Sequence, residues 1–117
     1  MTQEEKMRLI VRALDSKKAE DIQAIGIRDL TIIADYFIIA NGTSTTHTRA
    51  LADEAEFKLG EAGVKPARTE GYGSSSWIIL DYSDIVVHIF HKETRQFYSL
   101  ERLWSDGETI DISGFLK

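Results

Sequence analysis

Apolar side chains in the first third of the chain recur first at helical spacing and then at strand spacing. Between residues 2 and 18 they follow the i, i+3, i+4 repeat that places them on one helix face. Thr2 and Glu5 form a capping box, which satisfies free N–H groups where this helix begins. Residues 22–30 show a weaker strand pattern, and residues 35–40 are apolar on both faces. We therefore predict a helix and then two strands, the second of them central in a sheet.

The middle of the chain is typical of a second helix followed by a loop. An Asn-Gly pair at 41–42 ends the strand, and Thr43 or Ser44 is placed to cap a helix that extends to about residue 62. Gly63 fits the left-handed position that often follows a helix. Residues 68–76 are rich in Gly and Ser, so we expect a loop there.

The last third contains two apolar strands, 77–82 and 85–90, which a tight turn at 83–84 joins into a hairpin. Beyond the hairpin, apolar side chains recur along one side of a short third helix: Phe97, Leu100, Leu103 and Trp104. Residues from 105 onward show no usable period. The element order α-β-β-α-β-β-α predicts an α/β fold with a mixed β-sheet and flanking helices.

We assign residues 1–106 to a single domain and residues 107–117 to a C-terminal tail. No apolar run approaches the ~20 residues that a membrane-spanning helix needs. Residues 1–6 begin acidic, which is unlike a secretory signal or an Arg-rich transit peptide. We therefore expect a cytoplasmic protein that does not enter a membrane.

The net charge of the chain indicates which class of partner it can bind. The chain of 117 residues has 14 Lys and Arg against 19 Asp and Glu, a net charge of -5. Binding to a phosphate backbone requires several clustered basic residues, and the longest basic run is Lys17-Lys18. Direct nucleic-acid readout is therefore not expected, whereas a basic protein partner is electrostatically favourable. The absence of Cys excludes disulfides and thiolate metal sites.

The best candidate for a small-molecule site is the turn Asn41–Ser44, which lies between a strand and a helix N-terminus. Backbone N–H groups and the helix dipole favour an anion at such a place. However, the turn has no P-loop Lys and no further glycines of a dinucleotide motif. Gly in the turn and Ser at the cap are also what a simple strand-to-helix junction requires. We favour the junction and keep a nucleotide- or phosphate-binding enzyme as the alternative.

Carboxylates and histidines do not form a recognisable catalytic or metal-binding pattern. Asp53 and Glu54 are adjacent on a helix, where side chains diverge by ~100° and do not easily share a metal. His88 and His91 point to opposite faces of one strand, and His47 has no evident carboxylate partner. His88, inside an apolar strand, is typical of a hydrogen-bonded core or interface histidine. We expect no catalytic residue, no metal and no cofactor.

Both faces of the strand 77–82 are apolar. One face carries Trp77, Ile79 and Asp81, and the other carries Ile78, Leu80 and Tyr82. Each face must therefore be covered, either by helices or by another protein. The third helix also has more aromatic and Leu side chains than docking requires, and charged residues surround them, as in interface hot spots. We predict a protein-recognition surface here, with a homodimerising adaptor module on the same face as an alternative.

These segments together closely resemble the ribosomal silencing factor family, also called Iojap-like. The matching segments follow the family order and spacing: Asp35–Ser44, His47–Glu54, Glu70-Gly71, Trp77–Asp81, Asp84–Phe90 and Arg95–Trp104. Small departures are Ala34, Ser83 where Gly is usual in the turn, and Gln96 where Glu is usual. The change at Gln96 removes one negative charge near the expected binding surface.

The resemblance implies a nucleotidyltransferase-like α/β fold that has lost the catalytic carboxylates. It implies a non-enzymatic factor that binds a small basic protein, number fourteen, of the large ribosomal subunit. The bound factor would block joining of the small subunit and repress translation when nutrients are scarce, and homodimers are common in the family. The partner-binding residues carried over by position are Trp77, Asp81, His88, Tyr98, Leu100, Glu101 and Trp104. The aromatic and Leu side chains would be apolar anchors, and Asp81 and Glu101 would pair with Lys or Arg.

Overall fold

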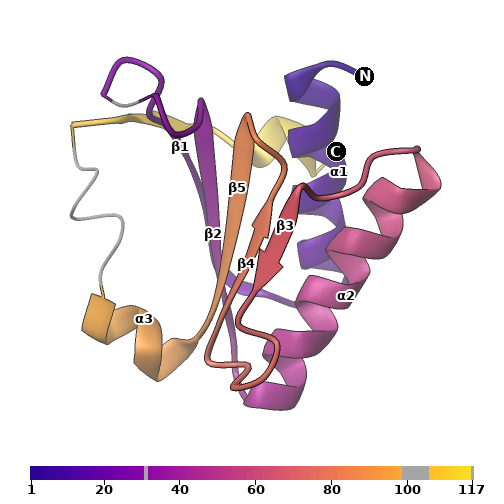
Figure 1. Cartoon of the computed structure of the whole chain (residues 1–117). Coiled ribbons are helices and arrows are strands. Elements are labelled where there is room, and N and C mark those ends of the chain that lie inside the picture. Colours follow the sequence, from indigo (N-terminus) through magenta and orange to yellow (C-terminus); the bar gives the residue numbers. More distant parts are fainter. Residues whose placement is uncertain (31, 99–105, 117) are drawn as a thin grey trace.

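The computed structural model describes residues 1–30, 32–98 and 106–116. Two long helices cover one face of a six-stranded sheet whose strand order is β3-β4-β5-β2-β1-β6, as Figure 1 shows. The elements in chain order are α1 (Gln3–Ser16), β1 (Glu20–Gly26), β2 (Tyr36–Gly42), α2 (Thr45–Glu61), β3 (Arg68–Glu70), β4 (Trp77–Asp81), β5 (Ile85–His91), α3 (Lys92–Tyr98), β6 (Glu108–Ile110) and the 3-10 helix η1 (Ser113–Phe115). The predicted α/β class with a mixed sheet and flanking helices is confirmed.

The sheet is built around one parallel pair. Strand β2 pairs in parallel with β5, and every other neighbouring pair is antiparallel. A parallel pair requires a long crossover, and here α2, β3 and β4 supply it between β2 and β5. Strand β2 therefore lies inside the sheet with a partner on each side, as its apolar character on both faces predicted.

The larger core lies between the sheet and helices α1 and α2. Helix α1 contributes its predicted apolar stripe, and α2 contributes Leu51, Leu59 and the small residues Ala52 and Ala55. Side chains of this core are almost completely buried, so removing one large aliphatic side chain would cost roughly 2–5 kcal/mol. A second, smaller cluster occupies the opposite face of the sheet; its buried members are Ile25, Ile27, Ala34, Phe37, Ile39, Val86 and Phe90.

Local capping signals in the sequence have the predicted geometry. The Thr2 hydroxyl accepts a hydrogen bond from the Glu5 amide at 3.1 Å, and Ser44 caps α2. After α2, Gly63 has a φ of +83°, and the Val64 amide donates to the Leu59 carbonyl at 2.9 Å. This is the Schellman ending, in which a left-handed residue lets a later amide reach back to the last turn.

Several boundaries differ from the sequence prediction. The strand expected at 22–30 is β1 at 20–26, because the chain turns where the Leu30 amide donates to the Ile27 carbonyl. Residues 68–70, expected to be loop, form the edge strand β3. Strand β6 and η1 lie in a segment for which no element was predicted. Both extra strands are three residues long and lie at opposite edges of the sheet.

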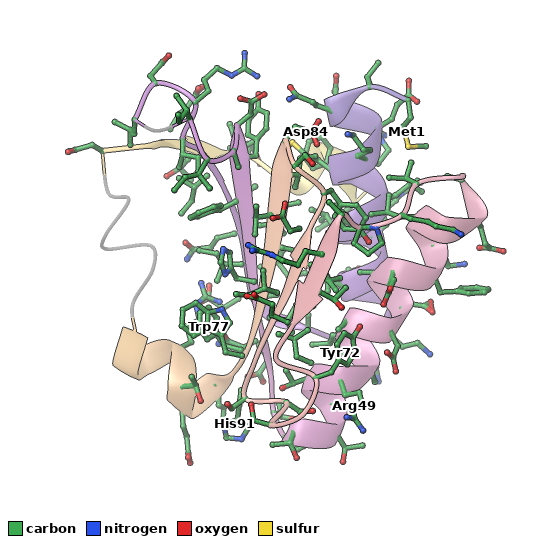
Figure 2. All side chains as sticks on the ribbon, in the orientation of Figure 1. Met1, Arg49, Tyr72, Trp77, Asp84 and His91 are labelled. Atoms are coloured by element: carbon green, nitrogen blue, oxygen red, sulfur yellow. The ribbon has the colours of Figure 1, made fainter. Side chains whose placement is uncertain are left out.

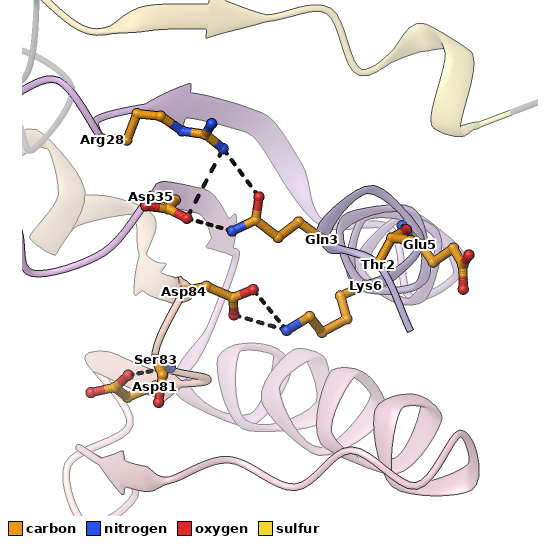
Figure 3. A network of polar contacts seen from close by, with 9 residues as sticks. All are labelled: Thr2, Gln3, Glu5, Lys6, Arg28, Asp35, Asp81, Ser83 and Asp84. Carbon is orange, nitrogen blue, oxygen red and sulfur yellow. Dashed lines mark hydrogen bonds and ion pairs between the residues drawn. The ribbon is translucent and has the colours of Figure 1, made fainter.

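A polar network fastens the start of α1 to the turn between β4 and β5 (Figure 3). The Lys6 ammonium contacts both carboxylate oxygens of Asp84, at 2.9 and 2.8 Å. The Asp84 carbonyl accepts the backbone amides of Asp35 and Tyr36, where β2 begins. These contacts hold the hairpin in register with the centre of the sheet.

No helix in the described part of the chain is long and apolar enough to span a membrane.

Candidate partner-binding surface

Three of the predicted partner-binding residues lie on one face of the β4–β5 hairpin. Cross-strand pairing places Trp77 opposite Phe90, Ile79 opposite His88, and Asp81 opposite Val86. Because side chains of directly paired residues share a face, Trp77, His88 and Asp81 all project from the face opposite α1 and α2. Figure 2 shows the Trp77 side chain on the side of the sheet away from α2. The face predicted for Trp77, Ile79 and Asp81 is confirmed.

Trp77 is half-buried and held from two directions. Its indole ring stacks on Phe90 with a centroid distance of 4.9 Å and an angle of 28°. Its Nε1–H donates a hydrogen bond to Nδ1 of His88 at 3.1 Å. Such packing fixes the ring orientation before any partner arrives, and a fixed aromatic side chain loses little entropy on binding. Trp77 therefore has the properties of a preorganised apolar anchor.

His88 supports this arrangement from inside the sheet and is only 6% exposed. Its ring meets Phe37 edge to face, with centroids 4.7 Å apart. Burial lowers the pKa of His88 to about 4, and the nearby Asp81 carboxylate opposes this shift only partly. The imidazole is therefore neutral near pH 7, with its proton on Nε2 because Nδ1 accepts from Trp77. His88 is thus placed to hold the Trp77 ring, and its contact with a partner stays a prediction.

Asp81 sits at the end of β4, where the hairpin turns. One carboxylate oxygen accepts the Ser83 amide at 2.8 Å, an Asx-type bond that suits Ser83 at a φ of +75°. The other oxygen lies 3.5 Å from a guanidinium nitrogen of Arg68 on the edge strand β3. Arg68 is mostly exposed, and exposed ion pairs contribute about 0–1 kcal/mol. The Asp81 side chain is 24% exposed, so its carboxylate can be reached by a basic partner that shares it with Arg68 or displaces Arg68.

The remaining predicted site residues fall outside what can be described. Helix α3 begins at Lys92, earlier than the helix predicted from the apolar side chains, and it is described as far as Tyr98. Leu100, Glu101 and Trp104 lie outside the described residues, as does the predicted apolar side of the third helix beyond residue 98. The structure therefore positions the backbone of Tyr98 and leaves the other three as sequence predictions.

Several polar groups of the Asn41–Ser44 turn are engaged within the chain. The Thr43 amide donates to Nδ1 of His47 at 2.9 Å, and the His47 amide donates to the Ser44 hydroxyl at 3.0 Å. A Cβ on Gly42 would lie 2.4 Å from the Thr48 hydroxyl and 2.7 Å from its amide nitrogen. Glycine is therefore required because the first turn of α2 approaches β2 closely. These are the features of a strand-to-helix junction.

Sequence reasoning missed two features of this region. The first is Arg95, which is 3% exposed and donates hydrogen bonds to Asp21 and Asn41. The Trp77–His88 hydrogen bond could have been found, because a turn at 83–84 fixes the hairpin register and puts these residues on neighbouring positions of one face.

Within the described ranges, no three His, Asp or Glu side chains converge in a way that could hold a metal ion.

Known proteins match this chain over its whole length. The sequence model of the family described as "Ribosomal silencing factor during starvation" matches residues 1–117. A ribosomal silencing factor from Halalkalibacterium halodurans is 39% identical over 116 residues, covering 99% of each chain. The crystal structure of a protein from Chromobacterium violaceum superposes with a TM-score of 0.88 at 34% identity, covering 97% of this chain and 93% of that one.

A more distant relative is a mouse protein. The mouse protein named "Mitochondrial assembly of ribosomal large subunit protein 1" is 32% identical over 100 residues, which are 83% of this chain and 44% of that protein. Its name concerns the large ribosomal subunit. Since the family model matches every residue and a silencing factor is 39% identical over nearly the full length, the chain belongs to the ribosomal silencing factor family.

Proposed function

We propose that this protein represses translation by binding the large ribosomal subunit, through its small basic protein number fourteen, and blocking the small subunit from joining. The observation that carries the proposal is the family match over residues 1–117. The name of the mouse relative, which refers to the large subunit, supports the choice of subunit. The site of action would be the cytoplasm, where the subunits join.

The hairpin face supports a protein partner of this chemistry. Trp77 would supply a preorganised apolar anchor, since Phe90 and His88 fix its ring. Asp81, on the same face, would supply a carboxylate to a Lys or Arg of the partner. A net charge of -5 favours approach to a basic protein over approach to ribosomal RNA. Tyr98, Leu100, Glu101 and Trp104 would extend this surface beyond the hairpin.

The mechanism requires no bond-making chemistry. The Cα trace measures 33 × 33 × 28 Å, whereas contacts between protein surfaces require atoms within ~4 Å of each other. A body of this thickness on the joining face of the large subunit would keep the small subunit from making its contacts there. In the Asn41–Ser44 turn, intrachain hydrogen bonds of Thr43 and His47 further favour a binding protein over a phosphate-binding enzyme.

Cosedimentation with purified ribosomal subunits tests the binding step, with Trp77→Ala compared against Phe57→Ala. Phe57 is an aromatic residue of α2 that is 58% exposed, and α2 covers the opposite face of the sheet. We expect the parent and Phe57→Ala to sediment with free large subunits but not with small subunits. Trp77→Ala should bind large subunits at least about tenfold more weakly, as expected for an interface anchor.

Thermal melting of each variant accompanies the binding measurement, because Trp77 also packs on Phe90. A folded Trp77→Ala protein that binds as tightly as the parent would place the interface elsewhere. Equal sedimentation of the parent with both subunits would reject the proposed partner. A homodimer that uses the same face would compete with the ribosome, and Trp77→Ala would then also weaken self-association in analytical ultracentrifugation.

A further inference from the structure

Helix α3 is joined to the sheet by a buried guanidinium. Arg95, in the first turns of α3, is 3% exposed. Its Nη1 donates hydrogen bonds to the Asp21 carbonyl at 2.6 Å and to Oδ1 of Asn41 at 2.9 Å. Its Nη2 lies 3.4 Å from the Asp21 carboxylate. A buried charge is tolerated only when polar partners compensate it, so these contacts hold Arg95 strictly in place.

The acceptors come from two strands whose backbone is shaped to present them. The register between β1 and β2 shifts at a bulge between Glu20 and Gln23, and Asp21 inside it has a φ of +51°. Few residues other than glycine adopt this conformation, and bulges of this kind redirect backbone groups away from the ladder. The Asp21 carbonyl is thereby turned toward Arg95. Asn41 is the next-to-last residue of β2 and pairs with Phe90 of β5.

The contacts of Arg95 with Asp21 and Asn41, called the clamp from here on, bear on the direction of α3. Within the described residues this helix covers Lys92–Tyr98. Helix α3 follows β5 without a linker, as Figure 1 shows. Its direction therefore depends on what ties it to the sheet. Asn41, which sequence analysis placed in a candidate phosphate site, is instead a partner of Arg95.

We propose that Arg95 and Asn41 are positioning residues that fix α3 against the ends of β1 and β2, and so set the place of Tyr98 in the partner-binding surface. This inference rests on the proposed function, because Tyr98 is the last described residue of α3 and begins the run of residues expected to bind the ribosomal partner. Arg95 itself acts through α3 and not by direct contact with a partner, because its side chain is buried.

The test compares Asn41→Ala with its matched control, Asn41→Asp, in the full-length chain. The Ala variant removes the acceptor of Arg95, whereas the Asp variant keeps an oxygen at the same place and adds a compensating charge. We expect amide hydrogen exchange in residues 92–98 to accelerate at least about tenfold in Asn41→Ala, the factor that corresponds to one hydrogen bond to a charged group. Exchange in α2 should stay unchanged, and binding to large subunits should weaken by a similar factor. Asn41→Asp should match the parent in both measurements.

The two measurements separate the clamp from the proposed function. Unchanged exchange in α3 of Asn41→Ala would overturn the clamp, whatever the binding result. Faster exchange with parental affinity for large subunits would overturn the positioning role. A parent protein that fails to bind large subunits would refute the proposed function, and the exchange rates would then still report on the clamp. Global unfolding of Asn41→Ala would appear as faster exchange in α2 as well. In that case Arg95→Lys, which keeps the charge but loses the bidentate donor geometry of the guanidinium, would have to accelerate exchange in α3 alone.

Discussion

His88 makes the stability of this domain depend on pH in a window that lies mostly above the ordinary pKa values of carboxylates. Its folded-state pKa is about 4, lowered from an ordinary value of 6.5 mainly by burial. The unfolded chain therefore binds a proton more readily than the folded chain between these two values. By linkage, the stabilisation is fully present above pH 6.5 and is lost as pH falls from 6.5 toward 4.

The size of the effect follows from the two pKa values. A difference of about 2.5 units corresponds to about 3 kcal/mol when fully expressed. Between pH 7.5 and pH 5.0 the part expressed is about 2 kcal/mol of unfolding free energy. For a marginally stable domain this is a large fraction of the total, since natural domains have about 5–15 kcal/mol.

Urea denaturation at pH 7.5, 6.5, 5.75 and 5.0 measures this loss, with His88→Asn as the test variant. Asparagine does not titrate, and its Oδ1 can accept from the Trp77 indole much as Nδ1 does. We expect the loss of about 2 kcal/mol in the parent to fall to a few tenths in His88→Asn. His91→Asn, which alters a partly exposed histidine of the same strand, should keep the full slope. A flat profile in the parent, or an unchanged slope in His88→Asn, would refute this account of the buried imidazole.

Two further predictions concern the Asn41–Ser44 turn and the pair Tyr98 and Glu101. Ser44→Ala removes the hydroxyl that accepts the His47 amide and should lower the unfolding free energy by about 1 kcal/mol in urea denaturation. Binding to large subunits should stay near the parental level. A nucleotide-dependent stabilisation that this substitution abolishes would instead support the enzyme alternative. Glu101→Lys combined with Tyr98→Ala should strongly weaken binding in a protein that still melts cooperatively, because like charge would face a basic partner. Parental binding by that folded double variant would show that Tyr98 and Glu101 are not part of the interface.

The parts of the fold that were predicted are those that local patterns determine. The stripe and caps of α1 and α2 depend on residues a few positions apart, and the structure confirms them. The hairpin is likewise local, since one short turn joins its strands. Strands β3 and β6 were missed because three residues carry no readable period. They are strands only because β4 and β1 offer free edges to pair with.

In the candidate site, too, local patterns predict one part, and only the tertiary structure determines the other. The face shared by Trp77 and Asp81 follows from strand alternation, and the sequence predicts it. The buried state of Arg95 could not be predicted, because it depends on a bulge at Asp21 far away in sequence. A charged side chain in a polar stretch normally suggests exposure. Only the tertiary arrangement of β1, β2 and α3 makes it a clamp.

The most direct test of the central claim is a subunit-joining assay followed by light scattering and sucrose-gradient analysis. Large subunits are incubated with the parent protein or with folded Trp77→Ala, and small subunits are then added. We expect fewer assembled ribosomes with the parent, in proportion to the large subunits it occupies, and near-normal joining with Trp77→Ala. Large subunits that carry the parent protein and still join small subunits at the uninhibited rate and yield would contradict this expectation.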